Sequence, residues 1–494
     1  MPVASVAVAG HFGDISASGD VRGRDSLRGS EDIAYSSGEW YREGCGGVFY
    51  ECRPERFQFP ERFQLQGERM IKTIHPARFS KTILVPASKS HTIRALFIAS
   101  FAEGTSRVLN PLDSEDTASC LRVCRLFGAR ITEGKTSGGE RILIVEGNRG
   151  CPAPPGLPVD VGNSGTTLYF ASALAALAGA EVSFTGDGQI CSRPSENLLR
   201  SLEDLGAKVS CEAGGRAPFT VRGPLRGGKT SIECPTSQYL SALLLAAPLI
   251  SPPGPIGPSE LPEGRACTEI DVPLLYEEPY VEMTLRWLED QGIRLERQGL
   301  RHFVIPGGQR YHAFEKAVPG DFSSATFFFC AAAVSGGPVT LRGLDMGDAQ
   351  GDKAVISILK SMGCAVKTAG TSITLTGASL KGRDIDMNAI PDALPALAAT
   401  ACFAGGKTRL LNVPQARLKE TDRIAVMASE LSKMGARIRE LPDGLEIEGG
   451  ADLRGCRVDG HADHRVVMAL AIAALSARGT TEIEGAEAVA VTFP

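Results

Sequence analysis

The 494-residue sequence lacks the features that mark several large classes of protein. Its 13 cysteines are an odd number, are scattered, and include no Cys-x-x-Cys pair, which argues against a disulfide framework or a zinc site. No apolar run is long enough to cross a membrane, and no signal-peptide core is expected at the start. The net charge of −5 gives no bulk attraction to nucleic acid or to an anionic membrane. We therefore expect a cytoplasmic protein with reduced thiols, with neither nucleic acid nor a membrane as partner.

The composition is that of a globular protein with more than one core. Hydrophobic residues make up 43% of the chain, and the length indicates two or three domains. Residues 1–70 differ, because they are rich in Gly, Ser, Arg and acidic residues and show little periodicity. Their acidic residues argue against an organelle transit peptide. Two interpretations stay open: a disordered tail, or a non-native extension ahead of a true start at Met70.

An apolar helix of small residues recurs along the rest of the chain. Apolar residues cover nearly its whole circumference, so we expect each copy to be interior. A glycine usually follows the last turn, which is a typical helix stop, and a strand follows the glycine. The six copies lie around residues 94–99, 174–179, 240–247, 329–333, 397–401 and 468–473.

A second, amphipathic helix alternates with the first and also ends in glycine before a strand. Its five copies end at Gly128, Gly206, Gly292, Gly363 and Gly435. The pattern predicts a unit of strand–helix–strand–helix–strand–strand, about 75 residues long, repeated nearly six times. Divided between two domains, six units give three each, with helices converging on a shared core and sheets outside. The cleft between the domains is then the expected site.

Charged and hydroxyl side chains gather where the small-residue helices begin. The clusters are Ser88-Lys89-Ser90, Asn163-Ser164-Gly165-Thr166, Thr236-Ser237-Gln238, Asp392 and Asp463-His464-Arg465. Helix N-termini favour anions, and charges beside apolar helices are costly unless they are paired or used. Lys, Arg and His beside Asp and Glu can hold an anionic substrate and move protons on it. We therefore expect one anion-binding site.

Each cluster also has a purely structural interpretation. Thr236 and Ser237 can be simple helix caps, and Arg193 can form a surface ion pair. The turn at Gly165 is not a Walker loop, because no Gly-Lys-Ser/Thr follows it. Residues 419–423 are typical of a solvated helix start. Asp463-His464-Arg465 leads directly into an almost wholly apolar helix, which favours a functional role.

Six motifs in order and spacing resemble the 5-enolpyruvylshikimate-3-phosphate (EPSP) synthase family, over a stretch from about Ile71 to Pro494. They are Ser88-Lys89-Ser90 with Arg94, Gly162-Asn163-Ser164-Gly165-Thr166, Arg193-Pro194, Ser237-Gln238-Tyr239-Leu240-Ser241-Ala242-Leu243, Lys419-Glu420-Thr421-Asp422-Arg423 and Asp463-His464-Arg465. The resemblance implies an α/β inverted barrel of two domains, each of three βαβαββ units, with the active site in the interdomain cleft. We expect residues 71–87 and about 315–494 to form one domain and residues 88–314 to form the other.

The resemblance also implies an activity. It is the transfer of an enolpyruvyl group from phosphoenolpyruvate to the 5-hydroxyl of shikimate 3-phosphate, through a tetrahedral ketal, with release of phosphate. No metal or organic cofactor is needed, and a monomer is expected. The implied proton-transfer residues are Asp392, Glu420 and Lys89, with His464 supporting Glu420. The implied phosphoenolpyruvate site is Lys89, Gly165, Arg193, Gln238, Arg423 and Arg465. The implied shikimate 3-phosphate site is Lys89, Ser90, Arg94, Thr236, Ser237, Gln238, Tyr280, Asp392, Gln415 and Lys419.

Four residues depart from the family's pattern. Tyr169 stands where Arg is usual, and Val491 where a Lys often contacts phosphoenolpyruvate. Glu277 stands at a phosphate-binding Ser, where a carboxylate repels the substrate phosphate unless it points away. Gln415 for Asn is a mild change, and the family has a further helix beyond the position of Pro494. We expect these changes to weaken activity or to alter the pose of the phosphate.

Two alternatives remain. UDP-N-acetylglucosamine enolpyruvyl transferase shares the fold and the donor, but it tends to carry Lys-Asn where this chain has Lys89-Ser90. It also lacks the Asp-His-Arg motif, and Cys191 does not match the spacing of its catalytic cysteine. The other alternative, motivated by the departures, is a catalytically impaired relative that binds shikimate-type anions or a partner protein.

Overall fold

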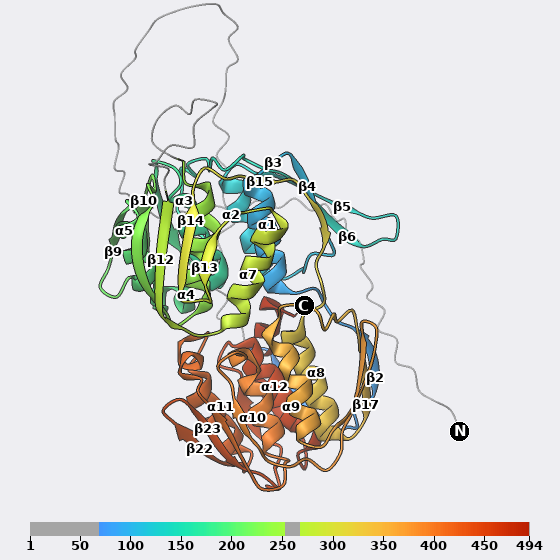
Figure 1. Ribbon diagram of the computed structural model, residues 1–494. Helices are drawn as coiled ribbons and strands as arrows, with labels where there is room; N and C mark the ends of the chain where they lie inside the picture. The colour runs from blue at the N-terminus through green and yellow to red at the C-terminus, as the bar shows by residue number, and fades with distance from the viewer. Residues whose placement is uncertain (1–68, 252–266, 494) are drawn as a thin grey trace, which may run out of the picture. The chain divides into compact units, whose positions relative to one another are not determined.

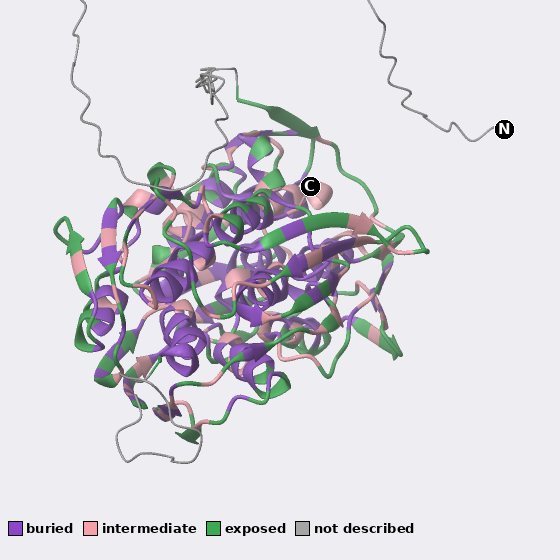
Figure 2. Ribbon diagram, turned by 90° about the horizontal axis from the view of Figure 1, so that it is seen from above, coloured by how far each residue is buried: buried purple, intermediate pink, exposed green. Residues whose placement is uncertain are grey.

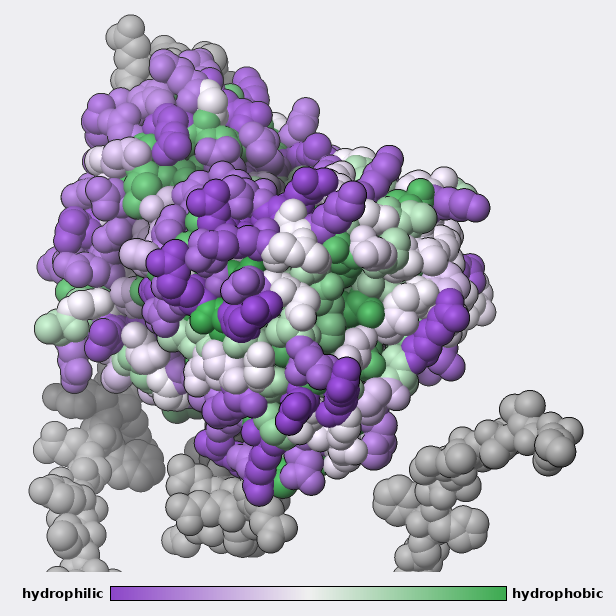
Figure 3. All heavy atoms as spheres, turned by 90° about the horizontal axis from the view of Figure 1, so that it is seen from below, coloured by the Kyte–Doolittle hydropathy of each residue, from purple (hydrophilic) through white to green (hydrophobic). Residues whose placement is uncertain are grey.

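A computed structural model describes residues 69–251 and 267–493 of the chain, which belong to one compact unit, Gln66–Pro494. The expectations for residues 1–68 lie outside this described part. None of the described helices is both long enough and apolar enough to cross a membrane. On the face seen from below, hydrophilic side chains cover most of the surface, with apolar groups between them (Figure 3).

Two separate hydrophobic cores lie within this unit. One contains buried residues from Ala87 to Val318, and the part of the chain around it is called the central lobe below. The other contains Val85 together with residues 322–488, and its surroundings are called the terminal lobe. In Figure 1 the helices of the central lobe run from blue to yellow-green, and those of the terminal lobe run from gold to red.

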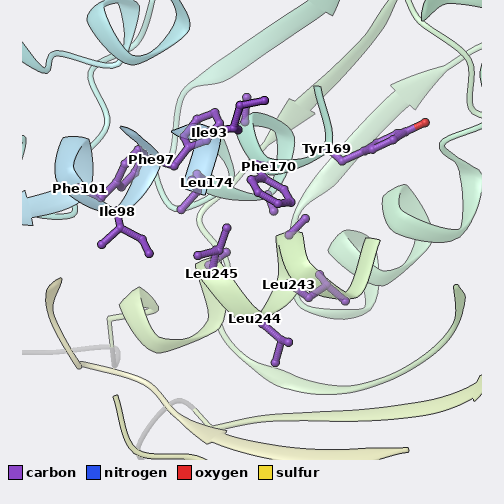
Figure 4. Packing of buried hydrophobic residues seen from close by; sticks show 14 of the residues in the cluster. Ile93, Phe97, Ile98, Phe101, Tyr169, Phe170, Leu174, Leu243, Leu244 and Leu245 are labelled. Carbon is purple, nitrogen blue, oxygen red and sulfur yellow. The ribbon is translucent and has the colours of Figure 1, made fainter. Parts of the chain in front are cut away.

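Six helices of small residues form the centres of these cores, as the sequence predicted. In the central lobe they are α1 (Lys89–Phe101), α3 (Gly165–Ala175) and α6 (Ser237–Ala246). In the terminal lobe they are α8 (Phe322–Ser335), α10 (Leu394–Ala401) and α12 (His464–Ser476). Most residues of each helix are buried, and each helix packs against at least one other of its set. Figure 2 shows the buried residues concentrated in these helices, and in Figure 4 Phe97, Leu174 and Leu245 converge from α1, α3 and α6.

The five amphipathic helices are also confirmed. They are α2 (Glu115–Leu126), α5 (Glu196–Asp204), α7 (Glu278–Asp290), α9 (Ala354–Ser361) and α11 (Arg423–Lys433). The glycine just beyond each helix adopts a positive φ, for example 94° at Gly128 and 96° at Gly435. Only glycine takes this conformation at no steric cost, so it ends the helix and turns the chain into the next strand. A short extra helix, α4 (Gly188–Ser192), precedes α5.

Five four-stranded sheets share one order of strands. A parallel pair comes first and two antiparallel neighbours follow, as in β7-β8-β10-β9 and β20-β21-β23-β22. The other three are β11-β12-β14-β13, β16-β4-β6-β5 and β2-β17-β19-β18, and smaller sheets are β1-β25-β24 and β15-β3. Burial alternates along strands such as β4 and β21, so one face packs on the helices and the other faces solvent.

The strands of the central lobe and its borders have the following bounds: β2 (Lys81–Leu84), β3 (Ala102–Glu103), β4 (Thr105–Leu109), β5 (Arg130–Lys135), β6 (Arg141–Glu146), β7 (Val159–Asp160), β8 (Glu181–Thr185), β9 (Lys208–Cys211), β10 (Phe219–Arg222), β11 (Gly228–Cys234), β12 (Cys267–Leu275), β13 (Glu296–Gln298), β14 (His302–Pro306), β15 (Tyr311–His312) and β16 (Glu315–Ala317). The remaining strands are β1 (Ile71–Ile74), β17 (Pro338–Arg342), β18 (Ala365–Ala369), β19 (Ser372–Thr376), β20 (Asp384–Asp386), β21 (Lys407–Leu411), β22 (Arg437–Leu441), β23 (Gly444–Glu448), β24 (Arg457–Asp459) and β25 (Thr481–Glu484).

The chain crosses between the lobes at two adjacent segments. Strand β2 precedes α1 but pairs with β17 of the terminal lobe, whereas β16 precedes α8 but pairs with β4 of the central lobe. The two crossing segments hydrogen-bond to each other, from Ser88 N to the Pro319 carbonyl (2.8 Å) and from Asp321 N to the Pro86 carbonyl (2.9 Å). This exchange brings the starts of α1 and α8 together, although they are far apart in sequence.

The first prediction tests the core of the central lobe. Leu174 is buried in α3, so Leu174→Ala should lower the free energy of unfolding by about 2–5 kcal/mol through lost burial and the cavity it leaves. Leu157 is 64% exposed, and Leu157→Ala is the matched control, with an expected change within about 0.5 kcal/mol. Urea unfolding of the three proteins measures both effects. Equal losses in the two variants would contradict the assignment of Leu174 to the core.

Candidate active site

The main cavity lies where helix starts from both lobes meet. The residues that line it include five cationic side chains, four carboxylates and several hydroxyls. The lining residues of the central lobe are Lys89, Ser90, Arg94, Thr166, Arg193, Ser237, Gln238, Glu277 and Tyr280. Those of the terminal lobe are Asp321, Ser323, Ser324, Phe327, Asp392, Lys419, Glu420, His464, Arg465, Met468 and Thr492. A smaller cavity adjoins it, shares Arg193, Gln238 and Lys419 with it, and contains Thr236, Gln415 and Tyr169.

Arg423, at the first position of α11, is the centre of the charged network. Its guanidinium is 1% exposed and contacts three carboxylates. Nε lies 2.8 Å from Asp463 Oδ2, Nη1 lies 2.9 Å from Asp392 Oδ1, and Nη2 donates to Glu420. Burial alone would lower the pKa of Arg423, but the three negative charges outweigh it and raise the pKa. Arg423 therefore stays charged and fixes the three carboxylates relative to one another.

Asp392 is surrounded by three cationic side chains of the terminal lobe. It sits in a single 3₁₀ turn (Pro391–Ala393) ahead of α10, and Arg465 Nη1 is 3.1 Å from its Oδ2. Lys419 Nζ is 4.0 Å from Oδ1. Burial alone would raise the pKa of Asp392, but Arg465, Lys419 and Arg423 together hold it well below its usual value. Asp392 is therefore a carboxylate whose basicity is set by its cationic neighbours.

His464 orients Arg465. The Arg465 Nε donates to His464 Nε2 over 3.2 Å, so the other ring nitrogen carries the proton, and Arg465 Nη1 also donates to Ser323 Oγ (3.0 Å). Burial, followed by the charge of Arg465, lowers the pKa of His464 to about 3, so the ring is neutral near pH 7. The expected support of Glu420 by His464 is not a hydrogen bond in the described structure.

Arg193 and Glu420 form an ion pair in the lining of the main cavity. Arg193 Nη2 is 3.4 Å from Glu420 Oε1, and burial of the Glu420 carboxyl is outweighed by Arg423 and Arg193, which lower its pKa. Arg193 Nε and Nη2 have no hydrogen-bond partner among the described residues, although both are buried. Buried unpaired donors are costly, which makes them available for an anion. A Cβ at Gly165 would lie 2.6 Å from Arg193 Nη1, so any larger residue there would displace this guanidinium from its present position.

Lys89 and Arg94 have different surroundings at the start of α1. Lys89 Nζ pairs with Asp116 of α2 at 2.8 Å. Arg94 is almost fully buried and donates to Thr284, Ser90 and Tyr280 at 2.8–3.0 Å, and burial lowers its pKa to about 9. Most of the Arg94 donors are therefore already used within the central lobe. Arg94 also lines the main cavity, and the part of its side chain that faces the cavity is available to a substrate.

The structure gathers most of the predicted residues around one cavity. Gln415 and Thr236 face the smaller adjoining cavity, and Arg423 lies beneath Asp392 and Glu420. Gln415 donates to the Asn388 carbonyl over 3.1 Å and is nearly fully buried. Lys419 and Glu420 are 13% exposed, so these two residues point into the cavity rather than into solvent. The interpretation of residues 419–423 as a solvated helix start is wrong for these two side chains.

The departures from the family's pattern fall in three different places. Tyr169 packs edge-on against Tyr239 and donates to the Pro194 carbonyl over 3.2 Å, so it belongs to the core and the smaller cavity. Val491 ends a 3₁₀ segment (Ala486–Val491), and the next residue, Thr492, lines the main cavity. Glu277 lines the main cavity and does not point away from it, so its carboxylate lies where it repels a substrate phosphate.

Several site residues escaped the sequence reasoning. Asp321, Ser323 and Ser324 line the main cavity from the start of α8. Asp321 caps that helix by accepting from Ser324 N (3.0 Å). Helix α8 is one of the six small-residue helices. The rule that located polar clusters at the starts of the other five would also have found this cluster. Asp116, the partner of Lys89, had no such signal, because it lies in the first turn of an amphipathic helix.

One group outside the cavity has metal-ligand chemistry. The ligand atoms of Glu269, Asp271 and His302 lie within 4.8 Å of one another on neighbouring strands. Lys229 Nζ lies 2.7 Å from Glu269 and 3.1 Å from Asp271, so an ammonium already occupies this group. The expectation that the protein holds no metal stays a prediction.

Asp352 is a buried acid that adjoins Asp392 through Tyr280. The Tyr280 hydroxyl donates to Asp352 Oδ2 at 2.9 Å and lies 3.5 Å from Asp392 Oδ2. Asp352 Oδ1 is buried without a partner among the described residues. Burial and then the charges of Asp392 and Asp321 raise the pKa of Asp352 to about 7, against the opposing effect of Arg465. Asp352 therefore keeps its proton in mildly acidic solution.

The second prediction follows from this raised pKa. Between the ordinary pKa of 3.8 and about 7, the folded protein holds a proton that the unfolded chain has lost, so stability falls as pH rises through this window. Asp352→Asn cannot ionise, so its stability should fall less than that of the wild type between about pH 5 and about pH 8. Unfolding in urea across this range measures the difference.

The matched control is Asp384→Asn. Asp384 is an exposed carboxylate whose pKa is lowered by Arg409, so it is ionised in both states throughout this range. Its curve should run parallel to that of the wild type. A parallel curve for Asp352→Asn as well would contradict the raised pKa.

Comparisons with known proteins identify the family of the chain. A family model described as EPSP synthase (3-phosphoshikimate 1-carboxyvinyltransferase) matches residues 74–494. A 3-phosphoshikimate 1-carboxyvinyltransferase of Acetivibrio thermocellus is 51% identical over 426 residues, which cover 86% of this chain and 96% of the relative. One of Ruminiclostridium cellulolyticum is 48% identical with the same coverage. A solved EPSP synthase of Acinetobacter baumannii matches with a TM-score of 0.68 at 28% identity, over 86% of this chain and 96% of that one. The chain therefore belongs to the EPSP synthase family, whose relatives named here are 3-phosphoshikimate 1-carboxyvinyltransferases.

Proposed function

We propose that the main cavity transfers the enolpyruvyl group of phosphoenolpyruvate to the 5-hydroxyl of shikimate 3-phosphate and releases phosphate. The observation that carries the proposal is that charged residues from distant motifs line one cavity, in a chain of this family. A C–O bond forms between the 5-oxygen and C2 of phosphoenolpyruvate, while the methylene carbon gains a proton. Loss of phosphate from the ketal and of a proton from its methyl group then restores the vinyl group.

Asp392 receives the proton of the 5-hydroxyl in this proposal. Its low pKa makes it a poor base as long as Arg465, Lys419 and Arg423 face it with no other anion nearby. Phosphate and carboxylate groups of the substrates compete for the same cations, and their charge raises the pKa of Asp392. Binding of both substrates therefore activates the base, because each anion removes part of the stabilisation of the carboxylate.

Lys89 and Glu420 handle the proton at the vinyl carbon. Lys89 brings a proton on an ammonium held by Asp116, and Glu420 lies between Arg193 and Arg423. Phosphoenolpyruvate binds Arg465, Gln238 and Arg193, whose Nε and Nη2 form no hydrogen bond among the described residues, beside Gly165. The resemblance also implies Arg423, whose buried guanidinium acts through the three carboxylates that it contacts. Cations placed around the developing charge lower the barrier without moving during the reaction.

The acceptor takes the other side of the cavity. Shikimate 3-phosphate contacts Ser90, Arg94, Thr236, Ser237, Tyr280, Gln415 and Lys419, as the resemblance implies. The N-terminus of α6 contributes backbone donors there. The reaction needs no metal or organic cofactor, and we propose that the protein is a cytoplasmic monomer.

The fold belongs to the same proposal. Six βαβαββ units form an inverted barrel, three in each of two domains, and the cavity lies in the interdomain cleft. The domains comprise residues 71–87 with about 315–494, and residues 88–314. The common strand order of five sheets and the two separate cores support this division, and the pairing of β16 with β4 moves the second crossing toward residue 318.

The third prediction is the assay of the activity itself. Purified protein supplied with shikimate 3-phosphate and phosphoenolpyruvate should release inorganic phosphate, and neither substrate alone should do so. Replacing shikimate 3-phosphate by UDP-N-acetylglucosamine tests the rival transferase and should give no release. Intact binding of shikimate 3-phosphate by calorimetry without any phosphate release would favour the impaired relative, which the position of Glu277 motivates.

The fourth prediction concerns the proton-transfer residues. Asp392→Ala and Glu420→Ala should each lower kcat by about 10²–10⁴-fold, the usual contribution of a positioned acid or base. Glu448, an exposed carboxylate 3.7 Å from Arg437, provides the control Glu448→Ala, which should keep the wild-type rate. Circular dichroism establishes that each variant is folded. Wild-type rates in a folded Asp392→Ala or Glu420→Ala protein would refute the role of that residue.

A further inference from the structure

Glu277 accepts from four donors in the main cavity that together suit an anion: Ser237 N, Ser237 Oγ, Thr236 Oγ1 and Lys419 Nζ. This set of donors is called the anion seat below. Glu277 Oε2 accepts from Ser237 N (3.2 Å), Ser237 Oγ (2.9 Å) and Thr236 Oγ1 (3.3 Å), and its Oε1 accepts from Lys419 Nζ. A backbone N–H at a helix N-terminus, two hydroxyls and an ammonium make the set of donors that proteins use for phosphate. The anion seat is therefore filled by the protein's own Glu277 carboxylate.

The backbone of Glu277 directs the side chain into this seat. The residue precedes α7 with φ 61° and ψ 39°, the left-handed conformation that side chains rarely adopt. Its carboxylate makes no capping bond to α7, the helix it begins, and instead caps α6. A non-glycine residue in this conformation is kept only where its surroundings compensate for it. The four donors of the seat provide that compensation, with the carboxylate nearly fully buried.

The contact with Lys419 also joins the two lobes. Glu277 and Ser237 belong to the central lobe, and Lys419 follows a 3₁₀ segment (Pro414–Leu418) of the terminal lobe. Lys419 also faces Asp392 at 4.0 Å. One ammonium is thus shared between Glu277, which fills the seat, and the carboxylate proposed as the base.

We infer that Glu277 is an internal competitor for the phosphate of the acceptor, and that it determines how strongly this site prefers a phosphorylated acceptor over the same molecule without phosphate. The inference rests on the proposed function. Two anions cannot share one ammonium and one set of hydroxyl and N–H donors, so the substrate phosphate must displace the carboxylate or bind weakly beside it. An acceptor without the phosphate has no such conflict.

The experiment compares binding of shikimate 3-phosphate and of shikimate by calorimetry in the wild type and three variants. Glu277→Gln keeps the shape and removes the charge, and Glu277→Ser empties the seat. Glu278→Gln is the matched control, because Glu278 is the neighbouring acid, is half exposed, and lies 3.8 Å from Arg301 outside the cavity. Phosphate release is measured in parallel on every protein.

Both Glu277 variants should bind shikimate 3-phosphate about tenfold more tightly or better, the effect of freeing charge-assisted donors for the ligand. Shikimate affinity should stay within about twofold of the wild type, and Glu278→Gln should match the wild type for both ligands. Unchanged affinity for shikimate 3-phosphate in both folded Glu277 variants would overturn the inference. An equal gain for both ligands would also overturn it.

The two proposals fail in distinguishable ways. Turnover by the wild type without any contrast between the ligands refutes the role of Glu277 and leaves the proposed function standing. The predicted contrast without phosphate release from any of the proteins refutes the proposed function and leaves the role of Glu277 standing.

Discussion

The contact of Arg423 with three carboxylates is the interaction on which the site depends. Asp463, Asp392 and Glu420 come from two helix starts and a turn, and one buried guanidinium fixes all three. Removing one partner of such a network leaves a buried charge without compensation, which typically costs about 3–5 kcal/mol. The network is therefore weak evidence for high stability but strong evidence for fixed geometry. Asp392 also contacts Arg465, Glu420 also contacts Arg193, and Asp463 lies beside His464, and all three of these partners line the cavity.

The cavity satisfies its own charges by pairing them internally. Lys89 pairs with Asp116, Arg465 with Asp392, and Lys419 with Glu277. A cavity lined only by cations would carry a large electrostatic cost, and these pairs remove most of it. Anionic substrates can then exchange with the internal carboxylates rather than bind to bare charges. The same exchange links substrate binding to the basicity of Asp392, because both draw on the same cations.

The sequence predicted the helices well because their signal is local. A helix of small apolar residues that ends in glycine can be recognised from a dozen residues, and all six proved to be buried. The positive φ of Gly128 and Gly435 follows from the same local rule. The motifs then predicted which helix starts carry the site. Asp321 and Ser323 were missed although they obey that rule, whereas Asp116 was missed because a buried partner for Lys89 has no local signature.

The sequence by itself therefore determined the element pattern, the interior helices and the residue types at the site, since these depend on periodicity and on neighbouring residues. The resemblance already implied that residues 71–87, which contain β2, belong with the terminal lobe. Only the tertiary structure decided that β16 pairs with β4 of the central lobe, because strand partners are chosen by pairing across more than 200 residues of chain. It also decided the direction of Glu277. The sequence placed a carboxylate near a phosphate-type site, but whether it faces solvent or fills the seat depends on a backbone conformation and on Lys419 from the other lobe.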